Sequence, residues 1–181
     1  MTEAPVASEQ LRTPTQIHAT PLHGIEAALA DLAAQCRRMP PVAALGAHPL
    51  GYDGRTLRLG APLLANVNDK GCAFGGSLSG LMTLAAWGWV MVNLQLAGHD
   101  SADADVIDVF VADSQVRYLA PLYEDLVAEA APVEGEQWIQ FLRTLEQRGK
   151  ARICMQARVP ISTGGDATLF SGRFVAIRRA N

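Results

Sequence analysis

The run GCAFGGSLSGLMTLAAWGWVMVNLQLAGH, residues 71–99, contains no Asp, Glu, Lys or Arg. It is long enough to cross a membrane, because a spanning helix needs only about 20 apolar residues. However, it is interrupted by several glycines and by polar residues such as Ser77 and Thr83, and no Lys/Arg cluster flanks it. A helix that is apolar almost all round can also lie at the centre of a soluble domain. We therefore predict an interior helix over about residues 76–96, closed by Gly98, and no association with a membrane.

The overall composition is that of a folded domain. The chain has 181 residues, of which 49% are hydrophobic and 18% charged, which argues against a disordered chain and against a coiled coil. The net charge of −3 argues against nucleic acid as a partner. We predict one domain over residues 22–181, preceded by a loosely ordered arm over residues 1–21 that lacks the pattern of a signal peptide.

The positions of the cysteines and histidines indicate the redox compartment of the protein and whether it has a metal site. Cys36, Cys72 and Cys154 are odd in number and lack the spacing of metal ligands, which favours a reducing, cytoplasmic location. The four histidines form no i, i+4 pair, so no metal site is predicted. No cofactor is expected.

The flanking sequence predicts helices and strands around the central helix. Upstream we expect an amphipathic helix with its apolar stripe between Ile25 and Cys36, ended by Pro40-Pro41, and a strand at Leu57 to Leu59. Downstream we expect strands at 106–119, 126–131, 151–159 and 169–177, an amphipathic helix from Trp138 to Leu145, a bulge near Asp113-Ser114, and a hairpin loop at 163–166. The fold class is therefore α+β, with a curved sheet around a long apolar helix.

The stretch NVNDKGCAFGGS, residues 66–77, leads directly into the central helix. Free N–H groups at a helix start carry partial positive charge, and Gly75 and Gly76 have no side chain to block an approaching ligand. This helix start is therefore a candidate site for an oxygen with developing negative charge. The alternative is that the two glycines only let the helix start pack against strands.

Two motifs together resemble one family. They are Asn68, Gly71 and Phe74-Gly75-Gly76-Ser77, followed downstream by VRYLAP at 116–121 and DLVA at 125–128. With the uncharged helix between them, they resemble the hot-dog acyl-CoA thioesterases over about residues 22–178. The likeness is greatest to the thioesterase domain that forms the C-terminal half of some acetyltransferase-like proteins.

The resemblance implies an architecture and a substrate class. It implies a hot-dog fold, in which an antiparallel sheet wraps a central helix, and a homodimer or dimer of dimers made by pairing edge strands. It also implies active sites at the dimer interface and a channel for the pantetheine arm of an acyl-CoA or an acyl-carrier thioester.

Many relatives carry Asn-x5-His-Gly-Gly and an Asp or Glu nine residues after the His. Asn68 and Gly75-Gly76 match this pattern, but Phe74 stands in place of the His and Thr83 in place of the carboxylate. The oxyanion donors implied by the resemblance remain, as the N–H groups of Gly76 or Ser77. Asp69 is the nearest replacement carboxylate in sequence.

The resulting candidate residues fall into two groups. The predicted catalytic group is Asn68, Asp69, Gly76, Ser77 and Thr83, with the two hydroxyls holding water. The predicted substrate-binding group is Phe74, Gly75, Trp87 and Tyr118.

Each polar candidate also has a structural alternative. Asn68-Asp69 is a natural turn pair, and Ser77 has the place of a helix cap. Thr83 can donate back to the carbonyl of Ser79.

Three functions follow from these observations. The first is an acyl thioester hydrolase. The second is an acyl-binding module without catalysis, which the missing helix carboxylate favours. The third is a structural dimer whose site has decayed.

Overall fold

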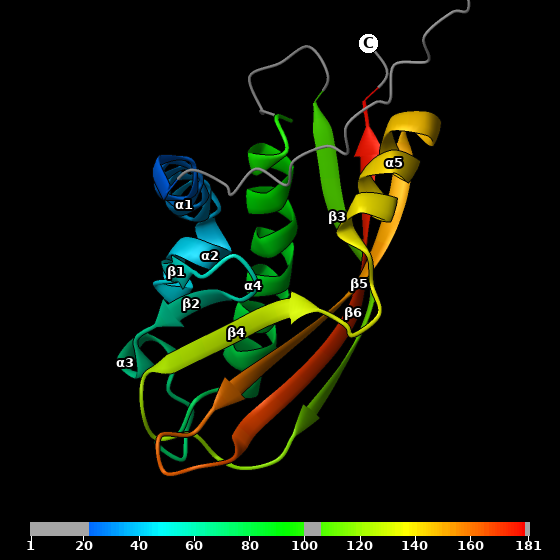
Figure 1. Ribbon diagram of the computed structural model, residues 1–181. Coiled ribbons are helices and arrows are strands. Elements are labelled where there is room, and N and C mark those ends of the chain that lie inside the picture. The colour runs from blue at the N-terminus through cyan, green and yellow to red at the C-terminus, as the bar shows by residue number, and fades with distance from the viewer. Residues whose placement is uncertain (1–21, 100–105, 180–181) are drawn as a thin grey trace, which may run out of the picture.

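A six-stranded antiparallel sheet wraps one long helix in the computed structural model, which describes residues 22–99 and 106–179 (Figure 1). The predicted arm over residues 1–21 lies outside the described residues. The strand order is β1-β2-β4-β5-β6-β3. The strands are β1 (His48–Tyr52), β2 (Leu57–Ala61), β3 (Ile107–Tyr118), β4 (Leu126–Pro132), β5 (Lys150–Pro160) and β6 (Asp166–Arg178). The α+β hot-dog fold is confirmed.

Helix α4 (Gly75–Leu96) is the interior rod that the sequence predicts. Leu81, Met82, Ala85 and Val90 are completely buried. The helix has the length and apolarity of a membrane span, but 67% of its most apolar window is buried inside the fold. Burial of apolar surface contributes about 25 cal/mol per Å², so the sheet and helix α1 provide the environment that a bilayer would otherwise supply.

The inner face of the sheet supplies the other half of the core. In β5 the buried residues alternate as predicted, with Ile153, Met155, Ala157 and Val159 facing α4. The loop between β5 and β6 turns through Gly164 and Gly165, both of which have positive φ, so the predicted hairpin is also confirmed.

Strand β3 forms one end of the sheet and pairs only with β6. Its register shifts between Val111 and Asp113, close to the bulge predicted at Asp113-Ser114. The strand is not buried along its whole length, because Phe110 and Val111 remain about half exposed. At this edge of the sheet, no second layer among the described residues covers them.

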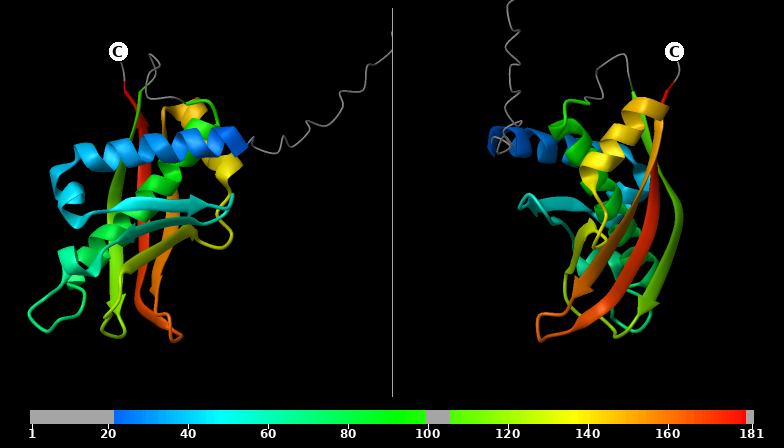
Figure 2. Two further views of the ribbon diagram at one scale, coloured as in Figure 1. Left: turned by 90° about the vertical axis from the view of Figure 1, so that its left-hand side faces the viewer. Right: turned by 45° about the vertical axis from the view of Figure 1, so that its right-hand side comes forward.

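The segment before α4 holds elements that the sequence did not predict. Helix α1 (Leu22–Arg38) matches its predicted stripe, with Ala28, Leu32 and Cys36 buried against α4. Pro40-Pro41 ends α1 but also starts a short helix, α2 (Pro40–Leu45), since proline fits the first helical turn. Strand β1 and the single turn α3 (Leu63–Asn66) follow (Figure 2).

Helix α5 (Trp138–Arg148) closes the far end of the core and ends at Gly149. An aromatic cluster fixes it there: Trp138 meets Trp89 of α4 edge-on at 5.3 Å between ring centroids and stacks on Phe141 at 4.7 Å. The Trp89 indole N–H donates to the carbonyl of Arg55 at 2.8 Å, so one side chain joins α4, α5 and the loop before β2.

Gly88 of α4 sets the closest approach between the central helix and its cover. A Cβ there would lie 3.1 Å from side-chain carbons of both Leu32 and Leu57. We expect Gly88→Val to lower the free energy of unfolding by about 1–3 kcal/mol through overpacking, measured by urea denaturation. Gly80→Val is the matched control, because the nearest atom to its Cβ is 3.7 Å away. Equal stability of the two variants would contradict this packing.

Candidate active site

An apolar cavity of about 710 Å³ lies beside the N-terminal half of α4, between α2 and the edge strand β3. Its volume falls within the range of ligand sites, roughly 300–1,000 Å³. The lining residues come from α2, α4, β3 and β6 and from the residues just before the two helices: Met39, Pro41, Val42, Leu45, Phe74, Gly76, Ser77, Ser79, Gly80, Thr83, Leu84, Trp87, Val109, Phe110, Val111 and Phe174. Five of the nine predicted site residues are therefore at one cavity, namely Phe74, Gly76, Ser77, Thr83 and Trp87.

The start of α4 presents free amides at this cavity. Phe74 is the N-cap in extended conformation, and the first helical bond runs from the Leu78 N–H to the Phe74 carbonyl. The N–H groups of Gly76 and Ser77 have no hydrogen-bond partner among the described residues. Phe74 offers no side-chain cap, so these donors stay available to an oxygen of a ligand.

Two aromatic rings occupy the space that the glycines leave. A Cβ on Gly76 would lie 2.3 Å from Cε1 of Phe74, and a Cβ on Gly75 would lie 3.3 Å from Cε1 of Tyr118. The Tyr118 hydroxyl also donates to the Gly75 carbonyl at 2.9 Å. The sequence predicted open space for a ligand at both glycines. Instead, aromatic rings occupy the positions that side chains on these glycines would take. Gly76 itself remains exposed at the cavity.

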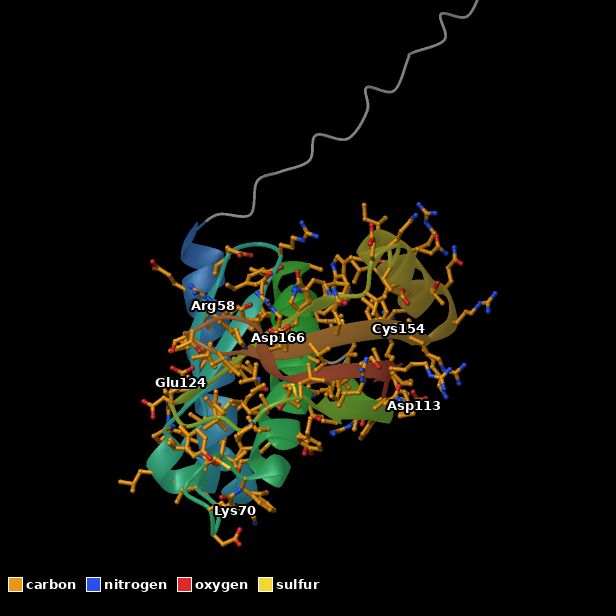
Figure 3. The ribbon with its side chains drawn as sticks, turned by 90° about the horizontal axis from the view of Figure 1, so that it is seen from below. Arg58, Lys70, Asp113, Glu124, Cys154 and Asp166 are labelled. Atoms are coloured by element: carbon orange, nitrogen blue, oxygen red, sulfur yellow. The ribbon has the colours of Figure 1, made fainter. Side chains whose placement is uncertain are left out.

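Asn68 and Asp69 lie in the loop before α4 and do not line the cavity. The Asn68 side chain closes this loop, accepting from the Lys70 N–H at 2.8 Å and donating to the sulfur of Cys72 at 3.2 Å. Asp69 is 80% exposed and pairs with Lys70 at 2.9 Å. Lys70 marks the tip of this loop in Figure 3. The turn that the Asn-Asp pair predicts is present, and a catalytic role for either residue stays a prediction.

Two of the hydroxyl groups at the cavity donate hydrogen bonds to backbone carbonyls of α4. Thr83 donates to the Ser79 carbonyl at 2.8 Å, the back-bond that its spacing predicts. Ser79 in turn donates to the Gly76 carbonyl at 3.0 Å. Ser77 is buried, with 6% of its surface exposed, and its side chain does not cap the helix. The oxygen atoms of these hydroxyls can still accept hydrogen bonds from water.

Trp87 joins the central helix to the edge strand. Its indole N–H donates to the Val109 carbonyl at 3.2 Å, and its ring lines the cavity. Trp89 points to the opposite, fully packed side. The two tryptophans thus lie on different sides of α4, and a substrate-binding role for Trp87 stays a prediction.

Among the residues that the structure describes, none that lines the cavity is Asp, Glu, His, Lys, Arg or Cys. The groups with shifted pKa values lie elsewhere. Burial raises the pKa of Tyr52, and hydrogen bonds from the Thr56 and Arg55 amides lower the pKa of Asp53. No group of three His, Cys, Asp or Glu side chains that could hold a metal ion occurs within the described residues. The site can therefore receive an uncharged apolar group and polarise one oxygen at the helix start.

A comparison with known protein families matches the segments that form this site. The YiiD_C family model, described as "Putative thioesterase (yiiD_Cterm)", matches residues 29–178. The chain belongs to this thioesterase family. The match spans α4, its N-terminal motif and the whole sheet. No protein with a curated description matches the chain.

Solved structures from bacteria share this fold. A protein of unknown function from Chlorobaculum tepidum is 27% identical with a TM-score of 0.78, covering 86% of this chain and 97% of that one. A structure from Shewanella oneidensis, described as a putative thioesterase, is 25% identical with a TM-score of 0.72, covering 84% and 99%. A Haemophilus influenzae thioesterase, at 16% identity and a TM-score of 0.60 with 83% and 90% covered, shows likeness of fold alone.

Sequence reasoning missed one wall of the cavity. Met39, Pro41, Val42 and Leu45 belong to α2 or its N-cap, and Pro40-Pro41 was interpreted only as the end of α1. The same dipeptide is also a helix-start signal, which could have identified α2. The contributions of Val109 and Phe174 depend on strand pairing and had no local signal.

The Phe74 ring explains why residue 76 is glycine. We expect Gly76→Ala to displace this ring and to lower the free energy of unfolding by about 1 kcal/mol. In a Phe74→Ala background the same change should be tolerated, giving a coupling free energy of about 1 kcal/mol in a double-mutant cycle followed by urea denaturation. Gly80→Ala in both backgrounds is the control. Purely additive effects of Gly76→Ala and Phe74→Ala would contradict the contact.

Proposed function

We propose that this member of the thioesterase family hydrolyses thioesters of uncharged, apolar acyl groups carried on coenzyme A or on an acyl carrier. The observation that carries the proposal is the cavity of about 710 Å³, which combines apolar walls with free amides at the start of α4. The walls would bury the acyl chain by the hydrophobic effect. The absence of charged lining side chains disfavours an acyl group with a second carboxylate.

In this proposal the acyl carbonyl accepts from the N–H groups of Gly76 and Ser77. A water oxygen attacks the carbonyl carbon, and the negative charge that develops on the carbonyl oxygen meets the amides and the helix dipole. When the intermediate collapses, the carbon–sulfur bond breaks. The thiolate of the carrier leaves with the proton that water has lost, and the acid is released.

The described lining residues supply no general base that could activate the water. Ser77 and Thr83 oxygens would hold a water molecule by accepting its hydrogen bonds, but a hydroxyl at neutral pH is no general base. Asp69 is kept as the candidate carboxylate, although its exposed pair with Lys70 gives it no contact with the cavity lining.

The missing base also favours a second function. A cavity with an apolar lining and no titratable group is suited to holding an acyl thioester without cleaving it. Calorimetry would then show acyl-CoA binding in the absence of turnover. A decayed site is supported less, because a cavity of ligand size is present at the start of α4.

We also propose that the chain forms a homodimer along β3 in a cytoplasmic, reducing environment. Strand β3 has one unpaired edge among the described residues, and Phe110 and Val111 are 54% and 45% exposed there. Unprotected strand edges favour pairing with another chain. A second copy would also cover the open side of the cavity. The three cysteines are free.

Turnover and its pH dependence test the proposed hydrolysis. We expect free-thiol release from a panel of acyl-CoA esters, with kcat/KM rising about tenfold per pH unit between pH 6 and 9, because the attacking water must lose its proton to solvent where no described lining residue can accept it. Asp69→Ala tests the alternative, in which Asp69 activates the water and the variant loses kcat/KM relative to the wild type. Absence of turnover for every ester, with binding by calorimetry, would leave only the binding function.

The dimer is tested by introducing charge into β3. We expect wild-type protein to show the mass of a dimer in light scattering, and Phe110→Glu to weaken association at least about tenfold, because it would bury an unpaired charge. Ile139→Glu on α5, where the side chain is 72% exposed, is the matched control. A monomeric wild-type chain, or equal dimer strength in both variants, would exclude this interface.

A further inference from the structure

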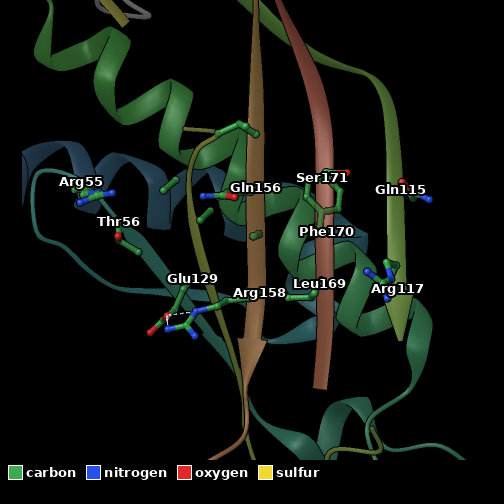
Figure 4. A pocket seen from close by; sticks show the side chains of 14 residues that line it. Arg55, Thr56, Gln115, Arg117, Glu129, Gln156, Arg158, Leu169, Phe170 and Ser171 are labelled. Atoms are coloured by element: carbon green, nitrogen blue, oxygen red, sulfur yellow. Dashed lines mark hydrogen bonds and ion pairs between the residues drawn. The ribbon is translucent and has the colours of Figure 1, made fainter. Parts of the chain in front are cut away.

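A second hollow of about 670 Å³ lies on the outer face of the sheet, opposite α4 (Figure 4). We name it the outer trough. Its outward side chains form two rows fixed by strand register. The first row is Ala131, Gln156, Ser171 and Gln115, and the second is Glu129, Arg158, Leu169 and Arg117. Arg55 and Thr56, just before β2, close one side.

The hollow has a simple steric origin. Ala131 and Ser171 in the first row are short, whereas Arg158 and Arg117 in the second row are long and exposed. Because side chains alternate between the two faces of a strand, neighbouring inward residues such as Ala157 and Phe170 form its floor. Figure 4 shows Arg55 and Arg117 on opposite sides of the trough, with Glu129 and Arg158 between them.

The charge of the outer trough has the opposite sign to that of the chain. Its lining includes three arginines and one carboxylate, whereas the chain as a whole has a net charge of −3. Arg158 is neutralised by Glu129 at 2.8 Å and approaches Asp166 at 3.4 Å. Arg55 and Arg117 have no side-chain partner among the described residues.

The polar groups between the arginines are also unused. The side-chain amides of Gln115 and Gln156 and the hydroxyls of Thr56 and Ser171 make no hydrogen bond to any described residue. Both amides and hydroxyls can donate and accept. The trough thus combines two guanidinium groups without a side-chain partner among the described residues and four neutral hydrogen-bonding groups over a floor of strand backbone.

We infer that the outer trough binds a small organic phosphate of about nucleotide size. Guanidinium groups match phosphate oxygens with paired hydrogen bonds, and a volume of about 670 Å³ exceeds what an inorganic anion would fill. Gln115, Gln156 and the hydroxyls would meet the hydrogen-bonding edge of the organic part. The sheet separates this site from the acyl cavity, so the inference does not depend on the proposed hydrolysis.

Calorimetry at low ionic strength tests the inference with ADP, inorganic phosphate and adenosine. We expect ADP to bind, phosphate to bind more weakly, and adenosine not to bind, since it has no anionic group. Arg55→Ala and Arg117→Ala should each weaken ADP binding about tenfold, and added salt should weaken it in the wild type. Arg148→Ala, an exposed arginine on α5 outside the trough, is the control and should leave the affinity unchanged.

Two results would overturn the inference. One is no detectable ADP binding by the wild type at millimolar concentration, as would happen if the sheet faces of two copies covered each other. The other is equal ADP affinity in the wild type and in the Arg55→Ala/Arg117→Ala double variant. The melting temperature of each variant confirms that the fold is retained, and thioester turnover measured in parallel reports separately on the acyl cavity.

Discussion

The need to bury a helix that is apolar on every side governs this structure. An ordinary surface helix buries one stripe, but α4 has apolar residues all round and must be covered on all sides. The curved sheet covers it on one side and α1 on another. Small residues make the close approach possible, as at Gly88, which has Leu32 and Leu57 directly against it. Elements distant in sequence are thus held together by contact with one rod.

The cavity beside the N-terminal half of α4 lies where that cover is incomplete. The sheet ends at β3, and the short α2 stands opposite, so the N-terminal half of α4 faces a space instead of another layer. The same half of the helix begins with amides that have no internal partner. Apolar walls and polar donors therefore meet at one point because a helix end and a sheet edge coincide there. Phe74 and Tyr118 hold the two glycines at this end in position.

The two faces of the sheet have opposite chemistry for a reason of backbone geometry. Successive side chains of a strand point to opposite faces, so β5 can place Ala157 toward α4 and Arg158 toward solvent. The inner face is consequently mostly apolar, as core packing requires, whereas the outer face carries arginines, carboxylates and amides. One sheet therefore has one face for core packing and one face for polar and charged groups.

Local sequence was sufficient to predict an element where its pattern depends directly on burial or on a reversal of the chain. The uncharged run at 71–99 determined the interior helix, the alternation in β5 determined which residues face it, and the glycines at 164 and 165 determined the hairpin. The motif around Gly75-Gly76 located the helix start where the cavity opens. These features depend on residues that are near neighbours along the chain.

Only the tertiary structure decided what surrounds that helix start. It brought α2, Val109 and Phe174 to one cavity, and it left Asn68 and Asp69 in a loop outside it. It also placed the rings of Phe74 and Tyr118 where side chains on the two glycines would lie, and it brought Arg55 and Arg117 to opposite sides of one hollow. Such placements follow from strand order and register, which arise from pairing between distant segments and leave no local signal in the sequence.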